Sequence, residues 1–173
     1  MKIADNLEEW NEDFRSGWLK KFKQNQSINW DLYSYVKNIT SIKNSGIDLS
    51  KSRLMLISSA GGYFLNREDP FDAANPLGDY SIRLLPVSTT PGEIDFAHEH
   101  YDITAVKKDL QVLLPFEHLT MLIDQGKIGR LCEAAISFMG YQPDATKVVN
   151  HMVPEIMDIV FQEKADAVLL VPS

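Results

Sequence analysis

Hydrophobic residues near the N-terminus recur at steps of three and four positions. The stripe consists of Leu7, Trp10, Phe14, Trp18 and Phe22. Acidic residues come early in this stretch and lysines late, as the helix dipole favours, so the pattern predicts one amphipathic helix. A second helix is predicted from Leu32 to Lys43, ending near Gly46.

Short apolar runs after residue 50 have the pattern of β-strands. Arg53 to Ser59 and Ala167 to Val171 are nearly continuous apolar runs, which is typical of strands buried on both faces of a parallel sheet. The alternation from Tyr80 to Val87 suits a strand at a sheet edge, and Gln111 to Pro115 predicts another strand. Arg130 to Ser137 fits either a strand or the start of a helix.

Helical patterns separate these strands. One covers Phe116 to Ile123 and closes at Gly126, and another covers Asp144 to Glu163. Alternating strands and helices predict an α/β fold, here an open, mostly parallel sheet flanked by helices, with an N-terminal helical extension. We divide the chain into the extension, residues 1–50, and an α/β domain, residues 51–173, which we expect to be incomplete at its C-terminal end.

That expectation comes from the last predicted strand. A strand buried on both faces normally lies in mid-sheet and is followed by a loop and a covering helix. Only Pro172 and Ser173 follow Val171. Ligands of open α/β folds bind at the carboxyl ends of the strands, so the sequence stops where an active-site loop is expected. Either a partner completes the site or the sequence is cut short.

The composition excludes several classes of protein. The 173 residues carry a net charge of −7, which argues against a nucleic-acid surface. No apolar run is long enough to cross a membrane, and the charged first ten residues contain no secretory signal. Cys132 is the single cysteine, which excludes an internal disulfide and a multi-cysteine zinc site. These features favour a cytoplasmic protein.

The first candidate for chemistry follows the first buried strand, in Ser58-Ser-Ala-Gly-Gly-Tyr63. Gly61 and Gly62 would let the backbone approach a ligand, with Tyr63 beside them. The glycine spacing of a dinucleotide fingerprint and the P-loop lysine are both absent. A tight turn without a ligand is the alternative.

A polar loop from Asn66 to Asp79 leads to the second candidate, Arg83. Long polar loops are often functional, and a guanidinium group can bind a substrate carboxylate through two hydrogen bonds. An ion pair between Arg83 and Asp79 or Asp72 is an equally good interpretation.

The densest candidate is His98-Glu-His-Tyr-Asp102. On an extended segment, the side chains of His98, His100 and Asp102 would point to one side. Two imidazoles and a carboxylate suit proton transfer, substrate binding, a divalent metal or structural hydrogen bonds, and the spacing does not choose among them. We favour proton transfer or substrate binding and expect no metal and no cofactor.

Several short motifs occur in a fixed order. They are Gly61-Gly62-Tyr63, Asp69-Pro-Phe-Asp72, Gly78-Asp79 with Ser81, Arg83 and Pro86, His98-Glu-His-Tyr-Asp102, Pro115, Gly126-Lys-Ile-Gly129 and Phe138-Met-Gly140. This ordered set resembles the selenoprotein B family of the glycine, sarcosine, betaine and D-proline reductases. The resemblance spans Arg53 to Ser173, and the first fifty residues look specific to this protein or its subgroup.

The resemblance implies reductive cleavage of a C–N bond in a small amine or amino acid, with the thiol–disulfide couple as redox partner. It also implies other reductase subunits and a thioredoxin-like electron donor as partners. The redox group of the family, a selenocysteine or cysteine with a second cysteine soon after, follows a strand resembling Ala167 to Pro172. Here the sequence ends at Ser173, so we hypothesise that a UGA selenocysteine codon was taken as a stop.

Two other functions stay open at this point. One is a non-catalytic subunit that keeps the α/β scaffold and binds a small ligand or a reductase partner. The other is a metal-dependent hydrolase that uses His98, His100 and Asp102, which metal analysis of the purified protein would distinguish.

Overall fold

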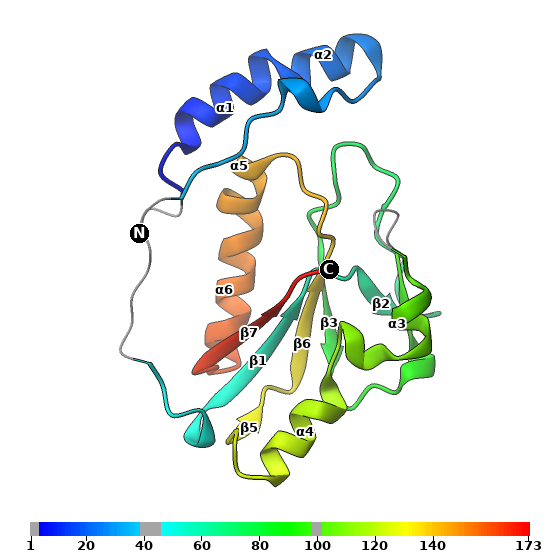
Figure 1. Cartoon of the computed structure of the whole chain (residues 1–173), viewed down its shortest axis with the longest axis vertical. Coiled ribbons are helices and arrows are strands. Elements are labelled where there is room, and N and C mark those ends of the chain that lie inside the picture. Colours follow the sequence, from blue (N-terminus) through cyan, green and yellow to red (C-terminus); the bar gives the residue numbers. More distant parts are fainter. Residues whose placement is uncertain (1–3, 39–45, 98–101) are drawn as a thin grey trace.

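The computed structural model describes residues 4–38, 46–97 and 102–173. In chain order its elements are α1 (Leu7–Ser16), α2 (Trp18–Asn25), β1 (Arg53–Ser58), β2 (Gly62–Phe64), β3 (Ile82–Pro86), β4 (Ile94–Phe96), α3 (Thr104–Lys108), α4 (Phe116–Asp124), β5 (Arg130–Leu131), β6 (Ala134–Phe138), α5 (Ala145–Lys147), α6 (Val153–Gln162) and β7 (Ala167–Val171). The predicted α/β class is confirmed (Figure 1).

The main sheet has β1 near its centre. β1 pairs in parallel with β6 on one side and with β7 on the other, and the short β5 pairs with the beginning of β1 on the β6 side. β3 pairs antiparallel with β6 and forms one edge, as its alternating sequence predicted. The sheet is therefore mostly parallel, with β7 at the opposite edge.

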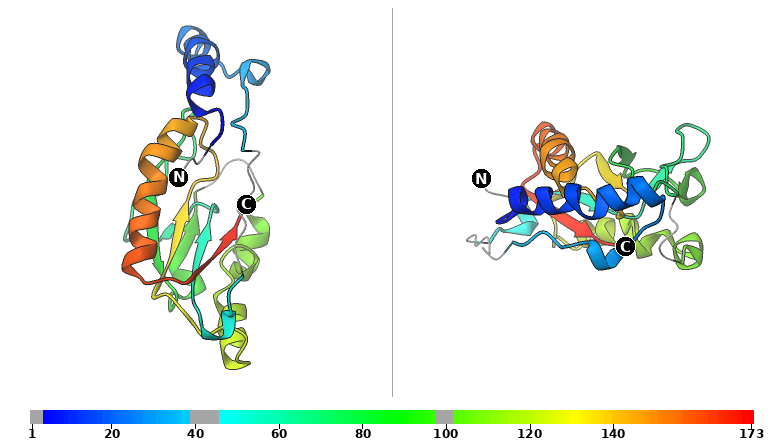
Figure 2. Two further views of the ribbon diagram at one scale, coloured as in Figure 1. Left: turned by 90° about the vertical axis from the view of Figure 1, so that its left-hand side faces the viewer. Right: turned by 90° about the horizontal axis from the view of Figure 1, so that it is seen from above.

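Helices and loops cover the two faces of the sheet unequally (Figure 2). α6 packs on one face, where Val160 joins a core cluster with Met55, Ile57 and Ile136. The other face carries a larger cluster formed with α3, α4 and the β2–β4 pair. β1 is buried along both faces because it contributes to both clusters, as its apolar run predicted.

The long helix before β7 contains one irregular turn. The carboxylate of Asp144 caps its start by accepting hydrogen bonds from the backbone N–H groups of Thr146 (3.0 Å) and Lys147 (3.3 Å). A π-helical turn over Val148–Met152 joins α5 to α6 just before Pro154, which has no N–H to donate. The predicted helix from Asp144 to Glu163 is confirmed, with this local adjustment.

The N-terminal stripe forms two helices instead of one. The helix is interrupted at Gly17. The aromatic rings nevertheless continue as one stack, with centroid distances of 4.8 Å from Trp10 to Phe14 and 5.3 Å from Phe14 to Trp18. The stack packs against Tyr33, Leu77 and Ala145 at the start of α5. The aromatic stripe therefore serves ordinary packing.

Two other predictions are wrong. Gln111 to Pro115 is no strand: the chain makes a 3-10 turn over Leu110–Val112, because the Asp109 carboxylate accepts the backbone N–H of Gln111 at 2.9 Å. Of the helix predicted from Leu32 to Lys43, residues 33–38 have no helical structure and residues 39–43 lie outside the described part.

β7 is a strand, as predicted, but it is not buried on both faces. It lies at the sheet edge with Val168 40% and Leu170 68% exposed. Within the described residues, no helix is long and apolar enough to cross a membrane.

Candidate functional site

The carboxyl ends of the three parallel strands lie together, beside the C-terminus of the chain (Figure 1). Ser58 of β1 lies opposite both Ser137 of β6 and Val171 of β7. Both serines are fully buried; the Ser58 hydroxyl accepts the N–H of Ala60 at 3.3 Å, and the Ser137 hydroxyl has no partner among the described residues. This end of the sheet is where parallel α/β folds place their ligands.

Ser173 is held against the end of β1. Its backbone N–H donates to the Ser59 hydroxyl at 2.9 Å, and its own hydroxyl donates to the Ser59 carbonyl at 2.9 Å. In addition, the Ser59 N–H donates to the Val171 carbonyl at 3.1 Å. These bonds fix the position of the polypeptide as it leaves β7.

The turn after β1 is tightly packed by the protein itself. Gly61 has a left-handed φ of +67°, and a Cβ atom there would lie 2.6 Å from the Ala97 carbonyl oxygen and 2.7 Å from Met139 Sδ. The Gly61 N–H donates to the Phe138 carbonyl at 2.9 Å, and the Gly61 carbonyl accepts the Ala97 N–H at 3.0 Å. This packing accounts for glycine at position 61 without a ligand.

Gly62 and Tyr63 belong to β2, which pairs with β4. A Cβ atom on Gly62 would lie 3.3 Å from the Phe96 ring. Tyr63 lies opposite Asp95, and its pKa is raised by burial and by the charge of that aspartate. The phenol therefore stays protonated at neutral pH and can donate a hydrogen bond.

Asp102 begins the segment that leads into α3. Its carboxylate accepts the backbone N–H of Thr104 at 2.8 Å, and hydrogen bonding from Thr104 lowers its pKa. The group is exposed and ionised. His98 and His100 lie outside the described residues, so the convergence predicted for the three side chains remains a prediction; Ala97, which precedes His98, is bonded to Gly61 as described above.

Arg83 is occupied by its own loop. Its guanidinium donates to the Ser81 hydroxyl and the Ile82 carbonyl, both at 3.0 Å, and lies 4.5 Å from the centre of the Phe71 ring. Neither Asp79 nor Asp72 forms an ion pair with it within the part of the chain that the structure covers. Arg83 therefore organises the loop, and a substrate contact would have to compete with these bonds.

Asp79 stabilises the same loop. Its carboxylate accepts the N–H groups of Asp72 (2.9 Å) and Ser81 (2.8 Å) and the Ser81 hydroxyl (2.6 Å). Burial alone would raise its pKa, but these hydrogen bonds and the charge of Arg83 outweigh burial and lower the pKa below its usual value. The loop of residues 66–79 is thus an ordered structure.

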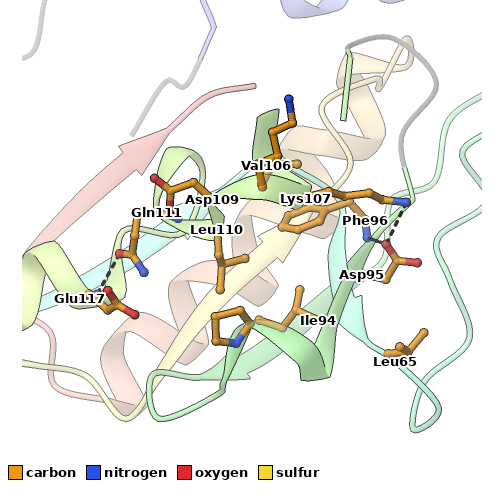
Figure 3. A pocket seen from close by; sticks show the side chains of 12 residues that line it. Leu65, Ile94, Asp95, Phe96, Val106, Lys107, Asp109, Leu110, Gln111 and Glu117 are labelled. Carbon is orange, nitrogen blue, oxygen red and sulfur yellow. Dashed lines mark hydrogen bonds and ion pairs between the residues drawn. The ribbon is translucent and has the colours of Figure 1, made fainter. Parts of the chain in front are cut away.

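A separate pocket of about 420 Å³ lies between β4, α3 and the start of α4 (Figure 3). Some of its polar side chains pair with neighbouring groups: Lys107 with Asp95 at 3.6 Å, and Gln111 with the backbone N–H of Glu117 at 2.9 Å. None of the candidate site residues that the sequence predicted lines this pocket.

Cys132 lies at the other end of the sheet. It is buried, its backbone N–H donates to the Leu54 carbonyl at 2.9 Å, and burial raises the pKa of its thiol. A buried thiol with a raised pKa is a poor nucleophile. Among the described histidine, cysteine, aspartate and glutamate residues, no group of three or more is arranged to hold a metal ion.

The fold and the serine-rich carboxyl end define an α/β protein with a candidate site at the ends of its parallel strands. The chain belongs to the glycine/sarcosine/betaine reductase selenoprotein B family, whose family model matches residues 19–173. The match begins at residue 19, the second residue of α2, which corrects the expectation that the first fifty residues lie outside the family resemblance.

One curated relative is the D-proline reductase subunit gamma of Acetoanaerobium sticklandii, 30% identical over 120 residues. The matched part is 69% of this chain and 48% of the relative, so it spans about half the length of that relative. No solved structure matches the chain.

Proposed function

We propose that this chain is part of a thiol-dependent reductase that cleaves a C–N bond of a small amine or amino acid. In the overall step the C–N bond breaks, carbon and nitrogen each gain a hydrogen, and two thiols become one disulfide. A thioredoxin-like donor would reduce that disulfide again, and other reductase subunits would assemble with the chain. Such thiol chemistry requires a reducing compartment, so the proposal places the protein in the cytoplasm.

The observation that supports the proposal is the attachment of Ser173 to Ser59. A selenocysteine or cysteine joined to Ser173 would emerge at the carboxyl end of β1, next to the buried hydroxyls of Ser58 and Ser137. Nucleophiles placed at this end of a parallel sheet face the ligand crevice. Family membership supports this position for the redox residue, and the relative is about twice as long as the part of it that this chain matches.

The same proposal gives the polar candidates their roles. His98 and His100 would donate the proton to the leaving amine or orient the substrate, and Asp102 would keep their segment in place through its bond to Thr104. The substrate would bind against the turn of Gly61, Gly62 and Tyr63. Arg83 would bind the substrate's carboxylate only after giving up one of its hydrogen bonds to Ser81 or Ile82.

The test begins with the DNA after Ser173. A UGA codon followed by an open frame with a nearby cysteine codon is expected; another stop codon would contradict the proposal. With UGA replaced by a cysteine codon, the longer protein should oxidise dithiothreitol in the presence of glycine, sarcosine, betaine or D-proline. The His100→Ala variant should fold normally, as judged by circular dichroism, and lose turnover; unchanged turnover would remove His100 from the site.

A non-catalytic ligand- or partner-binding subunit is the second candidate function. The raised pKa and burial of Cys132 favour it for the 173-residue form, because this thiol cannot serve as the redox nucleophile. Such a subunit would bind one of the four substrates, measured by calorimetry, without oxidising dithiothreitol even as the longer protein.

A further inference from the structure

The outer edge of β7 pairs with no strand among residues 4–38, 46–97 and 102–173. In a parallel strand, alternate residues direct their N–H and C=O groups to the same neighbour. The Val171 carbonyl accepts the Ser59 N–H, so Val171, Leu169 and Ala167 face β1. The N–H and C=O groups of Val168 and Leu170 therefore face outward, and no strand of the described part pairs with them.

Apolar side chains surround this edge on both faces of the sheet. On the face of α6, Val168 and Leu170 are exposed, and Met157 (40%) and Phe161 (70%) of that helix are exposed as well. A groove of about 980 Å³ lies along the first half of β7, and it reaches both faces of the sheet because Leu119 and Val160 both line it. It is lined mainly by aliphatic side chains, among them Ile47, Leu49, Leu119, Leu122, Ile128 and Leu169.

The other edge of the sheet is different. β3 carries Arg83 and ends at Pro86, and both residue types discourage a further strand from pairing. β7 has no charged residue or proline between Ala167 and Val171. An unprotected edge with apolar side chains on both faces is typical of a strand inside a sheet.

We propose that a β-strand from the polypeptide following Ser173 pairs with the outer edge of β7. This inference rests on the part of the proposed function in which the polypeptide continues past Ser173. The support for this occupant is its position: under the proposed function, the polypeptide leaves the sheet at Ser173, directly after β7. It would lie next to the β7 edge, which offers apolar surface on both faces.

The handedness of the connection adds a second element. α6 links β6 to β7 across one face of the sheet, and Figure 2 shows it on the side opposite α3 and α4. Right-handed crossovers are the rule for parallel strands, so a helix connecting β7 to a strand further out would lie on the same face as α6. It would pack beside α6 on that face.

The test compares two proteins by hydrogen–deuterium exchange: residues 1–173, and the longer protein with any UGA codon replaced by a cysteine codon. The amide protons of Val168 and Leu170 should exchange quickly in the short form and at least about 100-fold more slowly in the long form, because they become hydrogen bonded. Equal exchange in both forms, or a reading frame that ends at Ser173, would overturn the inference.

Matched lysine variants give an independent measurement. Leu170→Lys places a charge on the β7 edge, and Leu84→Lys places one on the β3 edge at a residue that is 45% exposed. Both should leave the melting temperature of the short form nearly unchanged. In the long form only Leu170→Lys should lower it, by about 5 °C or more, because the charge is then buried. Equal effects of the two variants in the long form would contradict the inference.

Three further outcomes separate this inference from the alternatives. A dimer of the short form in sedimentation that Leu170→Lys dissociates would overturn the inference, because a second copy would then occupy the edge. A protected β7 edge in a long form that reduces none of the four substrates would support the inference and reject the proposed function. An active long form whose β7 edge exchanges freely would do the reverse.

Discussion

Replacing Gly61 with alanine tests whether packing or a ligand explains the glycine turn after β1. The added Cβ atom would lie 2.6 Å from the Ala97 carbonyl oxygen, which is backbone and cannot move without shifting β4. It would also lie 2.7 Å from Met139 Sδ, which is flexible. The contact with the Ala97 carbonyl oxygen therefore makes the substitution destabilising.

Gly126 provides a matched control. Its φ of +68° is almost the same as the +67° of Gly61, but a Cβ atom there would meet nothing within 4 Å. Gly126→Ala should therefore lose only about 1–2 kcal/mol, the strain of an L-residue in the left-handed region. Gly61→Ala adds the overpacking term of about 1–3 kcal/mol, so its loss should be about 2–5 kcal/mol.

The assay is thermal or urea unfolding of the 173-residue protein, followed by circular dichroism. For a domain of this size, the difference of about 1–3 kcal/mol between the two variants corresponds to a difference of about 2–12 °C in melting temperature. Equal losses in the two variants would refute the packing explanation. A Gly61→Ala protein as stable as the wild type that no longer bound substrate would instead support the ligand-facing role.

Three further predictions concern the loop before β3 and the single thiol. The pKa of Asp79 is lowered in the folded protein, so the stabilising effect of this carboxylate is complete above the pKa of the unfolded chain and is lost as pH falls through the folded pKa. Asp79→Asn should therefore lower the urea midpoint at pH 7. The urea midpoint of this variant should also depend less on pH below 4 than that of the wild type. Arg83→Lys loses the planar contact with Phe71 and should reduce the unfolding free energy by about 1 kcal/mol, and limited proteolysis should cleave residues 66–81 faster than in the wild type. Cys132 should react with a disulfide reagent only after urea is added, and rapid labelling of the native protein, measured by absorbance, would contradict its burial.

The successes of the sequence-based predictions lie where local pattern decides structure. The strand β1 and the helix α4 were both predicted. A strand buried on both faces has a continuous apolar run, and a helix buried on one face has an apolar stripe, so both are visible in the sequence. The run from Gln111 to Pro115 has the same composition as a strand, but a single Asp109 side chain diverts it into a 3-10 turn. Such a side-chain bond leaves only a weak signal in an apolar pattern.

The sequence predicts where a candidate site lies, but it does not predict the contacts of the residues there. Strand order places the ends of β1 and β7 together, and the segment from Ser58 to Tyr63 after β1 was predicted as a candidate for chemistry. The bonds between Ser59 and Ser173 join residues 114 positions apart, and no local pattern indicates them. Likewise, the glycines were expected to face a ligand, whereas Ala97 and Met139 approach Gly61 from segments far along the chain.

The position of Cys132 decides where a resolving thiol must come from. Cys132 is bonded to Leu54 at the start of β1, whereas Ser173 is bonded to Ser59 just beyond its end. Five residues of extended strand separate Leu54 from Ser59, which is about 16 Å at a rise of about 3.3 Å per residue. A disulfide requires Cα atoms within about 7 Å, so Cys132 cannot exchange with a redox residue attached to Ser173. If the proposed reductase chemistry occurs at this site, its second thiol has to come from polypeptide beyond residue 173 or from a partner subunit.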